Sequence, residues 1–289
     1  MESLALTDSG NLYGAIEFYK ECKKNNIKPI IGVDFYVAVR SRHDKEARVD
    51  SERSRLLLLA KNETGYKNLL KMVTESFLEG FYYKPRIDKE LVEKYHDNLI
   101  AILPASVQNS SEEFALFYKK VFGPENFYIE ITRHLEIMGH ENRMKERVAL
   151  AQKNGIPLVA AHDIYYLEPE DKLARDTVLS IQGHIGGGNG SFDSGSEEDL
   201  SFPDQKKMEK NFKDIPEALA NAASIANRCN LELTLGNWVF PKIMIRENLS
   251  PDKMLEKIVY EGIEKRGLKK TPTEIERLEY ELKIIKDKG

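Results

Sequence analysis

The chain has 289 residues, of which 41% are hydrophobic and 31% charged, a balance typical of a folded globular protein and not of a disordered one. Its 43 basic and 47 acidic residues give a net charge of −4, which excludes a module that binds a phosphate backbone through a large basic excess. No apolar run approaches the roughly 18 residues of a membrane helix, and no signal peptide is visible. The two cysteines are too few for a disulfide framework. We therefore expect a protein of the reducing cytoplasm without membrane contact.

Strand-like and helix-like segments alternate over the first 161 residues. Runs of apolar residues predict buried strands, and apolar residues three or four positions apart predict helices. The predicted strands are 4–6, 29–39, 56–60, 99–103, 127–131 and 156–161, and the predicted helices are 12–25, 65–78, 112–122 and 142–154. Strands that alternate with helices favour parallel βαβ units. The sequence therefore predicts an α/β barrel or a related layered sheet.

The pattern changes after Gln182. The glycine-rich residues 183–195 predict a loop, and this loop is not a phosphate-binding P-loop, because no Gly-Lys-Ser/Thr follows it. The rest of the chain is predicted to be helical. Asp214 is expected to cap one helix, and Thr273 with Glu276 is expected to form the capping box of the last.

Polar residues at the carboxyl ends of strands are the first candidates for a site in an α/β barrel. Here these positions are Asp8, Asp34, Ser106, 130–134 and 162–163. Carboxylates and imidazoles that converge there are ligands suited to Zn²⁺ or Mn²⁺.

The alternative interpretation gives the same residues structural roles. Asp8 and Asp163 then cap helices or turns, and His134 and His162 are ordinary polar residues. The other histidines lie in polar or glycine-rich segments and are predicted to be solvated: His43, His96, His140 and His184.

The segment Ala5–Ala15 resembles the second motif of the PHP (polymerase and histidinol phosphatase) domain of bacterial replicative DNA polymerase III alpha subunits. Later segments resemble further motifs of that family in the family's order, including a passage that leads toward the polymerase palm: 28–37, 65–69, 83–88, 127–130, 162–167, 225–233, 241–242 and 277–282. The resemblance covers essentially the whole chain.

This resemblance implies a PHP-type distorted (βα) barrel followed by a helical extension. Residues 1–182 would form the barrel, 183–200 the glycine-rich loop, and 201–289 the remainder of the domain with a helical lead-in to the palm. Active members of the family bind up to three metal ions at the strand ends, and some are phosphoesterases or 3′→5′ proofreading exonucleases. In such sites the ions activate a water molecule and neutralise the phosphodiester in the transition state.

The sequence departs from the family's metal-binding pattern. The opening His-x-His motif is absent, because the chain begins after it. Ser9 and Tyr165 stand at positions where the family commonly has histidine, and Asp34 stands where it commonly has glutamate. The ligand candidates that remain are Asp8, Asp34, Glu130, His134 and Asp163.

We therefore expect a vestigial site with no firmly bound cofactor and, at most, one weakly bound Mg²⁺ or Mn²⁺. Carboxylates held close together without an ion repel one another, so a basic side chain is expected among them. Arg133 and Arg86 are the candidates, since they lie near the motifs in the sequence.

Two functions compete at this point. In the first, the chain is the N-terminal PHP module of a replicative DNA polymerase, inactive by itself, which supports the polymerase core. Its partners would be the palm, thumb and fingers of the same chain and a proofreading exonuclease subunit, with DNA and the sliding clamp reached through the full-length subunit. Nucleotidyl transfer and its Mg²⁺ would then lie outside this chain. In the second, the chain is a working metal-dependent phosphoesterase or 3′→5′ exonuclease.

The missing first strand predicts an incomplete barrel. Without it, the strand near residues 3–7 has an unpaired edge or a rearranged neighbour, and its free backbone groups need cover. We therefore expect another segment or chain near that edge.

Overall fold

The computed structural model describes residues 2–105, 112–134, 136–185, 199–238, 245 and 249–288. The chain divides into two compact units, residues 1–233 and 234–289. Helices α7 (Gln205–Asn211) and α8 (Pro216–Arg228) pack within the first unit.

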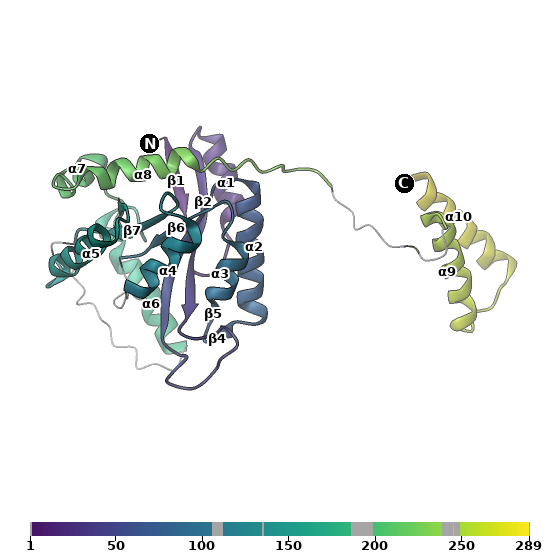
Figure 1. Ribbon diagram of the computed structural model, residues 1–289. Coiled ribbons are helices and arrows are strands. Elements are labelled where there is room, and N and C mark those ends of the chain that lie inside the picture. Colours follow the sequence, from purple (N-terminus) through teal and green to yellow (C-terminus); the bar gives the residue numbers. More distant parts are fainter. Residues whose placement is uncertain are drawn as a thin grey trace. The chain divides into compact units, whose positions relative to one another are not determined.

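The first unit is built on a mixed sheet of eight strands (Figure 1). The strands follow one another in the order β4-β5-β2-β3-β6-β7-β8, and β1 pairs with β2 off this path. Every predicted strand is present, and β4 and β5 are additional. Their bounds are β1 Ser3–Leu6, β2 Lys28–Ala38, β3 Arg53–Ala60, β4 Phe81–Tyr82, β5 Lys84–Ile87, β6 Leu99–Leu103, β7 Phe127–Ile131 and β8 Leu158–Ala160.

Strand β3 runs antiparallel to both of its neighbours, β2 and β6, whereas the pairs β1–β2, β6–β7 and β7–β8 are parallel. The prediction of parallel units is therefore wrong at β3. The connection from β2 to β3, residues 39–52, contains no helix that could carry the chain back across the sheet, so the chain returns beside β2. As a result, the first residues of β3 lie at the edge where the parallel strands end.

The outer face of the sheet carries the main hydrophobic core. Phe35, Leu58 and Phe127 point to this face and are buried against Leu69 and Tyr118 of the covering helices. Alternate residues of a strand point to opposite faces, so each strand contributes every second side chain. The helices that supply the core are α2 Glu63–Leu78, α3 Lys89–Tyr95, α4 Glu112–Phe122 and α5 His140–Asn154.

The inner face is covered differently, by helix α8 at the end where the parallel strands begin. Ile225 of α8 and Cys229, which directly follows the helix, pack on apolar residues of the inner face, among them Ile30, Ile102 and Val159. Polar contacts fix the helix there, because the Lys28 ammonium donates to the carbonyl of Ala226 at 2.6 Å and the Asn221 amide donates to the carbonyl of Leu158 at 2.8 Å. The opposite end of the inner face carries the polar residues of the candidate site.

Among the described residues, β1 has β2 as its only strand partner, and β8 ends the other side of the sheet. The sheet is thus an open, partial barrel, as expected. Helix α1 (Ala15–Lys24) and residues 231–233 lie close to this side, where the Tyr19 hydroxyl donates to Glu232 at 3.1 Å. Whether a further segment or chain covers the free edge of β1 stays a prediction.

Several local predictions require correction. Helix α6 (Lys172–Ile185) extends into the stretch predicted to be an irregular loop. Ile215 occupies the N-cap position of α8, with Pro216 at the first helical position and no side-chain cap, so Asp214 is not the cap. The capping box of α10 (Pro272–Lys288) is formed by Thr271 and Glu274, two residues before the predicted pair. Ser106 and residues 241–242 lie outside the described residues.

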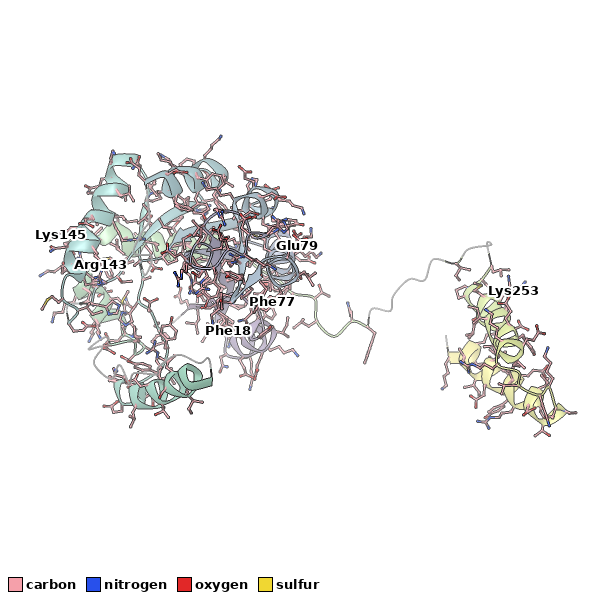
Figure 2. All side chains as sticks on the ribbon, turned by 90° about the horizontal axis from the view of Figure 1, so that it is seen from below. Phe18, Phe77, Glu79, Arg143, Lys145 and Lys253 are labelled. Carbon is pink, nitrogen blue, oxygen red and sulfur yellow. The ribbon has the colours of Figure 1, made fainter. Side chains whose placement is uncertain are left out.

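The second unit contains helices α9 (Pro251–Lys265) and α10. The hydroxyl of Ser250 accepts from the amide of Lys253 at 3.4 Å and so caps α9. Neither helix has a buried residue, and several of their apolar side chains are largely exposed: Ile258, Tyr280, Ile284 and Ile285. Lys253 marks this unit in Figure 2. None of the helices in the described part of the chain has the length and apolar content needed to cross a lipid bilayer.

Candidate functional site

The predicted site residues lie where the parallel strands end. Asp34 lies within β2 on the inner face, Glu130 lies near the end of β7, and Asp163 follows β8. The charge of Asp163 acts on both Asp34 and Glu130, so the three side chains are electrostatic neighbours. We call Asp34, Glu130 and Asp163 the carboxylate cluster.

Asp34 forms a two-pronged ion pair with Arg55 of β3. The Arg55 Nε atom donates to Asp34 Oδ1 at 2.9 Å, and Nη2 makes a short contact with Asp34 Oδ2. The same Nη2 donates to the hydroxyl of Ser9 at 2.9 Å. Burial raises the pKa of Asp34 above its ordinary value despite the opposing hydrogen bonds and charge of Arg55, and the charge of Asp163 adds to the rise.

The register of β2 and β3 explains why Arg55 reaches Asp34. Arg55 lies directly opposite Tyr36, two residues along from Asp34, so the three side chains share the inner face. The guanidinium carbon of Arg55 lies 4.3 Å from the centre of the Tyr36 ring. The backbone pairing between β1 and β2 continues past the end of β1, because the amide of Asp34 donates to the carbonyl of Asp8 at 3.1 Å.

Glu130 is the most deeply buried member of the carboxylate cluster, with 7% of its surface exposed. Its Oε1 accepts a hydrogen bond from the amide of Ala105 at 2.9 Å. Burial, and after it the charge of Asp163, raises the pKa of Glu130 to about 7, although the Ala105 amide and the charge of Arg147 oppose the rise. Near neutral pH the Glu130 carboxyl group is therefore partly protonated, whereas an ordinary glutamate is fully ionised.

Asp8 and Tyr165 lie at the margin of this arrangement. No hydrogen bond or ion pair joins the Asp8 carboxylate to another described residue. A Cβ atom placed on Gly14 would lie 3.4 Å from Asp8 Oδ2, which places this carboxylate beside the start of α1. The Tyr165 ring is 63% exposed and lies under the guanidinium of Arg175 at 4.6 Å.

Three histidines form a second group, the imidazole cluster of His134, His140 and His162. The rings of His134 and His162 stack with centres 4.9 Å apart, and His140 meets His134 edge-on at 5.1 Å. The Nδ1 of His134 lies 3.0 Å from Glu136 Oε1. Among the described residues, the buried Nε2 atoms of His134 and His162 have no hydrogen-bond partner. Burial lowers the pKa of His140 and of His162, and the neighbouring His134 adds to both shifts.

The prediction that His140 is solvated is wrong. This residue is 5% exposed, and its Nε2 lies 3.1 Å from the carbonyl of Thr132. His43 and His96 are partly exposed, in line with the prediction, and the side chain of His184 lies outside the described residues.

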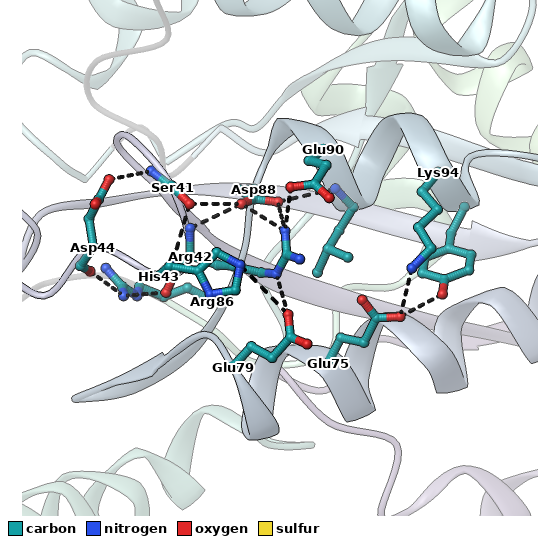
Figure 3. A network of polar contacts seen from close by, with 12 residues as sticks. Ser41, Arg42, His43, Asp44, Glu75, Glu79, Arg86, Asp88, Glu90 and Lys94 are labelled. Carbon is teal, nitrogen blue, oxygen red and sulfur yellow. Dashed lines mark hydrogen bonds and ion pairs between the residues drawn. The ribbon is translucent and has the colours of Figure 1, made fainter.

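The predicted counter-charges also require correction. Arg133 pairs with Glu141 and Asp214, at 3.0 and 2.7 Å, and not with the carboxylate cluster. Arg86 is fully buried elsewhere, where it donates to the backbone carbonyls of Gly80, Arg42, Asp44 and Asp50. Figure 3 shows it near Arg42 and Asp44. The basic partner is Arg55, which sequence reasoning missed.

Around Arg86, ion pairs and hydrogen bonds between charged side chains fix the loop that follows β2, residues 39–52. Arg42 contacts both oxygens of Asp88 at 3.1 Å, and its Nε donates to Glu79 at 2.8 Å. Asp88 also caps α3 by accepting from the amide of Leu91 at 3.1 Å. Glu79 directly follows the end of α2, next to the exposed Phe77 (Figure 2). We call Arg42, Asp50, Arg86 and Asp88 the loop network.

The described residues include no group of three or more His, Cys, Asp or Glu side chains arranged to hold a metal ion. His162 of the imidazole cluster and Asp163 of the carboxylate cluster are adjacent in the chain, and the charge of Asp163 acts on His162. What the carboxylate cluster does hold is the guanidinium of Arg55.

Comparison with known proteins shows what the chain is similar to. Residues 1–134 match the family model of the PHP domain. The chain as a whole is similar to DNA polymerase III subunit alpha of several bacteria. It is 38% identical to that of Borreliella burgdorferi over 99% of this chain, 34% identical to that of Treponema pallidum over 98%, and 32% identical to that of Aquifex aeolicus over 100%. The resemblance read from the motifs is confirmed.

The chain spans about a quarter of the length of these relatives: 26%, 25% and 27% of the three proteins, respectively. Among solved structures, an amidohydrolase from Chromobacterium violaceum shares 13% identity at a TM-score of 0.39, over 56% of this chain and 76% of that one.

Proposed function

We propose that this chain is the PHP module of a bacterial replicative DNA polymerase and that it supports the polymerase without catalysing a reaction itself. Such a polymerase works in the cytoplasm, and its nucleotidyl transfer, with the Mg²⁺ that this reaction needs, belongs to the parts of the subunit outside this chain. The observation that carries the proposal is the similarity to alpha subunits over 98–100% of the chain, from the partial barrel through the last helix.

The composition of the carboxylate cluster supports a non-catalytic role. Metal-assisted hydrolysis needs ions that activate a water molecule and neutralise the phosphodiester. Here Ser9 and Tyr165 replace imidazoles, and both oxygens of Asp34 are engaged by Arg55. The residues we assign to the vestigial site are Asp8, Asp34, Glu130, His134 and Asp163.

The second unit supports the proposal that the module serves a larger chain. Two helices with no buried residue and exposed Ile258, Ile284 and Ile285 bury too little apolar surface to be stable alone. We propose that the remainder of the polymerase subunit, its palm, thumb and fingers, covers this apolar surface. A proofreading exonuclease subunit, DNA and the sliding clamp are further proposed partners of the full-length protein.

One observation favours a second candidate function, a metal-dependent phosphoesterase or 3′→5′ exonuclease. The buried Nε2 atoms of His134 and His162 have no partner among the described residues, and such atoms are suited to bind a metal ion. In that case the imidazole cluster would supply the ligands that Ser9 and Tyr165 do not.

A nuclease assay on the full-length subunit separates the two functions. The subunit should extend a primed template and should release no nucleotides from a labelled single strand through this module, with Mn²⁺ or Zn²⁺ present. The matched variants are Asp8→Asn and Asp163→Asn. Metal-dependent release of 3′ nucleotides that both substitutions abolish, while primer extension continues, would establish the second function.

A further inference from the structure

We infer that the guanidinium of Arg55 takes the role that a metal ion has in an active PHP site. The positive charge of the carboxylate cluster then comes from a side chain of the protein and not from a bound ion. The inference deepens the proposed function and rests on it, because it explains how a PHP domain without metal chemistry can retain its carboxylates.

The residues around Asp34 do not fit a metal ion. Imidazoles are missing at Ser9 and Tyr165, where the family pattern has them. Both oxygens of Asp34 are already bound by nitrogen atoms of Arg55. Among the described residues, no three acidic, histidine or cysteine side chains form a group that could hold an ion. A metal would have to displace Arg55 to reach Asp34.

The contacts of Arg55 join two positions of the former site. The guanidinium binds Asp34 through two nitrogens, and one of these also donates to Ser9 at 2.9 Å. These two residues come from different segments, the end of the β1 region and the middle of β2, which a shared metal ion would also join. A planar guanidinium matches a carboxylate through two parallel hydrogen bonds, so it can replace an ion that links such groups.

The position of Arg55 is built into the sheet. Its place opposite Tyr36 fixes it on the inner face, and the Tyr36 ring supports the guanidinium at 4.3 Å. A cation over an aromatic face is stabilised by the ring. An arginine also keeps its charge at any pH that proteins survive. The cluster therefore holds a positive charge that neither dilution nor a chelator can remove.

The charge balance of the cluster gives the consequence that can be tested. Asp163 acts on Asp34 and on Glu130, and Arg55 is the cation bound directly to this cluster through Asp34. Without Arg55, the carboxylates repel one another and regain free oxygens. Carboxylate oxygens are ligands that Mn²⁺ and Mg²⁺ accept. Removal of Arg55 should thus convert a cluster indifferent to divalent cations into one that binds them.

The test compares Arg55→Gln with the parent chain by thermal unfolding in EDTA and in 1 mM MnCl₂, together with calorimetric titration of Mn²⁺. Arg55→Gln should unfold about 5 °C lower than the parent in EDTA, and Mn²⁺ should restore at least half of this loss. The parent should show no Mn²⁺-dependent shift. Arg53→Gln is the matched control on the same strand: it removes an arginine near Tyr36 that does not bind Asp34, and it should show no response to Mn²⁺.

Two further variants keep the result interpretable. Asp34→Asn combined with Arg55→Gln removes the carboxylate as well and should abolish the Mn²⁺ response. If Arg55→Gln does not fold in EDTA, the refolding yield with and without Mn²⁺ replaces the melting temperature and should rise several-fold with the ion.

Two outcomes would overturn the inference. One is saturable Mn²⁺ binding by the parent chain that depends on Asp34, because Arg55 would then not take the place of an ion. The other is an Arg55→Gln variant whose stability or refolding yield does not respond to Mn²⁺. Neither outcome affects the proposed function, which fails only if the full-length subunit shows metal-dependent nuclease activity in this module.

Discussion

Two groups of charged side chains lie in the first unit, and they are balanced differently. In the loop network, Arg42 faces Asp88 (Figure 3). Asp50 is bound by Arg40, and Arg86 donates to four backbone carbonyls. In the carboxylate cluster, Arg55 is bound to Asp34 alone, and burial with the charge of Asp163 raises the pKa of Glu130 to about 7 although the charge of Arg147 opposes the rise.

The difference indicates what each group is for. A network in which every buried charge has a partner stabilises one conformation of the loop, and its members are worth most to folding. A cluster with excess negative charge is costly to the fold, and such clusters are typical of sites that evolved to bind something. This contrast supports the proposal that the carboxylate cluster is a vestigial site, whereas the loop network has the composition of a structural element.

The largest effect is expected in the loop network. Arg86→Met should lower the free energy of unfolding by about 4 kcal/mol, because it leaves the carbonyls of Arg42, Asp44 and Asp50 without the donors they have in a buried place, and leaves that of Gly80 only the backbone amide of residue 86. Urea unfolding followed by circular dichroism measures the loss.

The matched control for this variant is Lys67→Met, which removes a basic side chain from a surface ion pair with Glu63 and should cost less than about 0.5 kcal/mol. Equal losses in the two variants would show that the loop network is not the structural element described above.

The carboxylate cluster should respond to pH in a way that the loop network does not. The pKa of Glu130 is raised to about 7 in the folded chain, so the folded state holds a proton that the unfolded state has released. The contribution of this group to stability is therefore fully present below the ordinary glutamate pKa of about 4.3 and is lost as the pH rises to about 7.

Glu130→Gln should remove this loss. The variant should be on the order of 3 kcal/mol more stable than the parent chain at pH 8, and nearly equal to it at pH 4. Urea unfolding across this pH range gives the difference between the two chains. Glu113→Gln, on an exposed side chain, should run parallel to the parent. A difference between Glu130→Gln and the parent that does not change with pH would contradict the assignment.

These two groups also show how far the sequence could be used. The ends of β1, β2, β7 and β8 were predictable from apolar runs, and because these strands are parallel their carboxylates gather at one edge. The need for a basic partner was predictable from repulsion alone. Its identity was not, because the alternation of strands and helices suggested that β3 is parallel.

In a parallel β3, Arg55 would lie at the far end of the sheet from Asp34. The antiparallel direction brings the first residues of the strand to the site. The sequence did contain a signal for the position of Arg55. Leu56 and Leu58 are buried on the outer face, and because alternate residues of a strand point to opposite faces, Arg55 points to the inner face. His140 was missed for a related reason: a polar neighbourhood in the sequence does not reveal that the ring packs on His134.

A smaller effect should come from the ring beneath Arg55. Tyr36→Leu should cost about 1 kcal/mol of unfolding free energy, because it removes the aromatic face that lies 4.3 Å from the guanidinium. Tyr36→Phe keeps the ring and should cost much less. A double-mutant cycle of Tyr36→Leu with Arg55→Gln measures the coupling, and additive losses would show that the ring does not support Arg55.

The smallest effect is expected at Asp8, and it gives the sharpest contrast within the site. Asp8→Asn should change the unfolding free energy by less than about 0.5 kcal/mol, because no described residue forms a hydrogen bond or ion pair with this carboxylate. Asp34→Asn makes the same chemical change and should cost about 2 kcal/mol, since it leaves Arg55 partly buried without its partner. If an ion joined the two carboxylates, the two substitutions would be similarly costly and the losses would disappear in EDTA. If Arg55 alone organises this end of the sheet, the difference between the two variants should be unchanged by EDTA or by Mn²⁺.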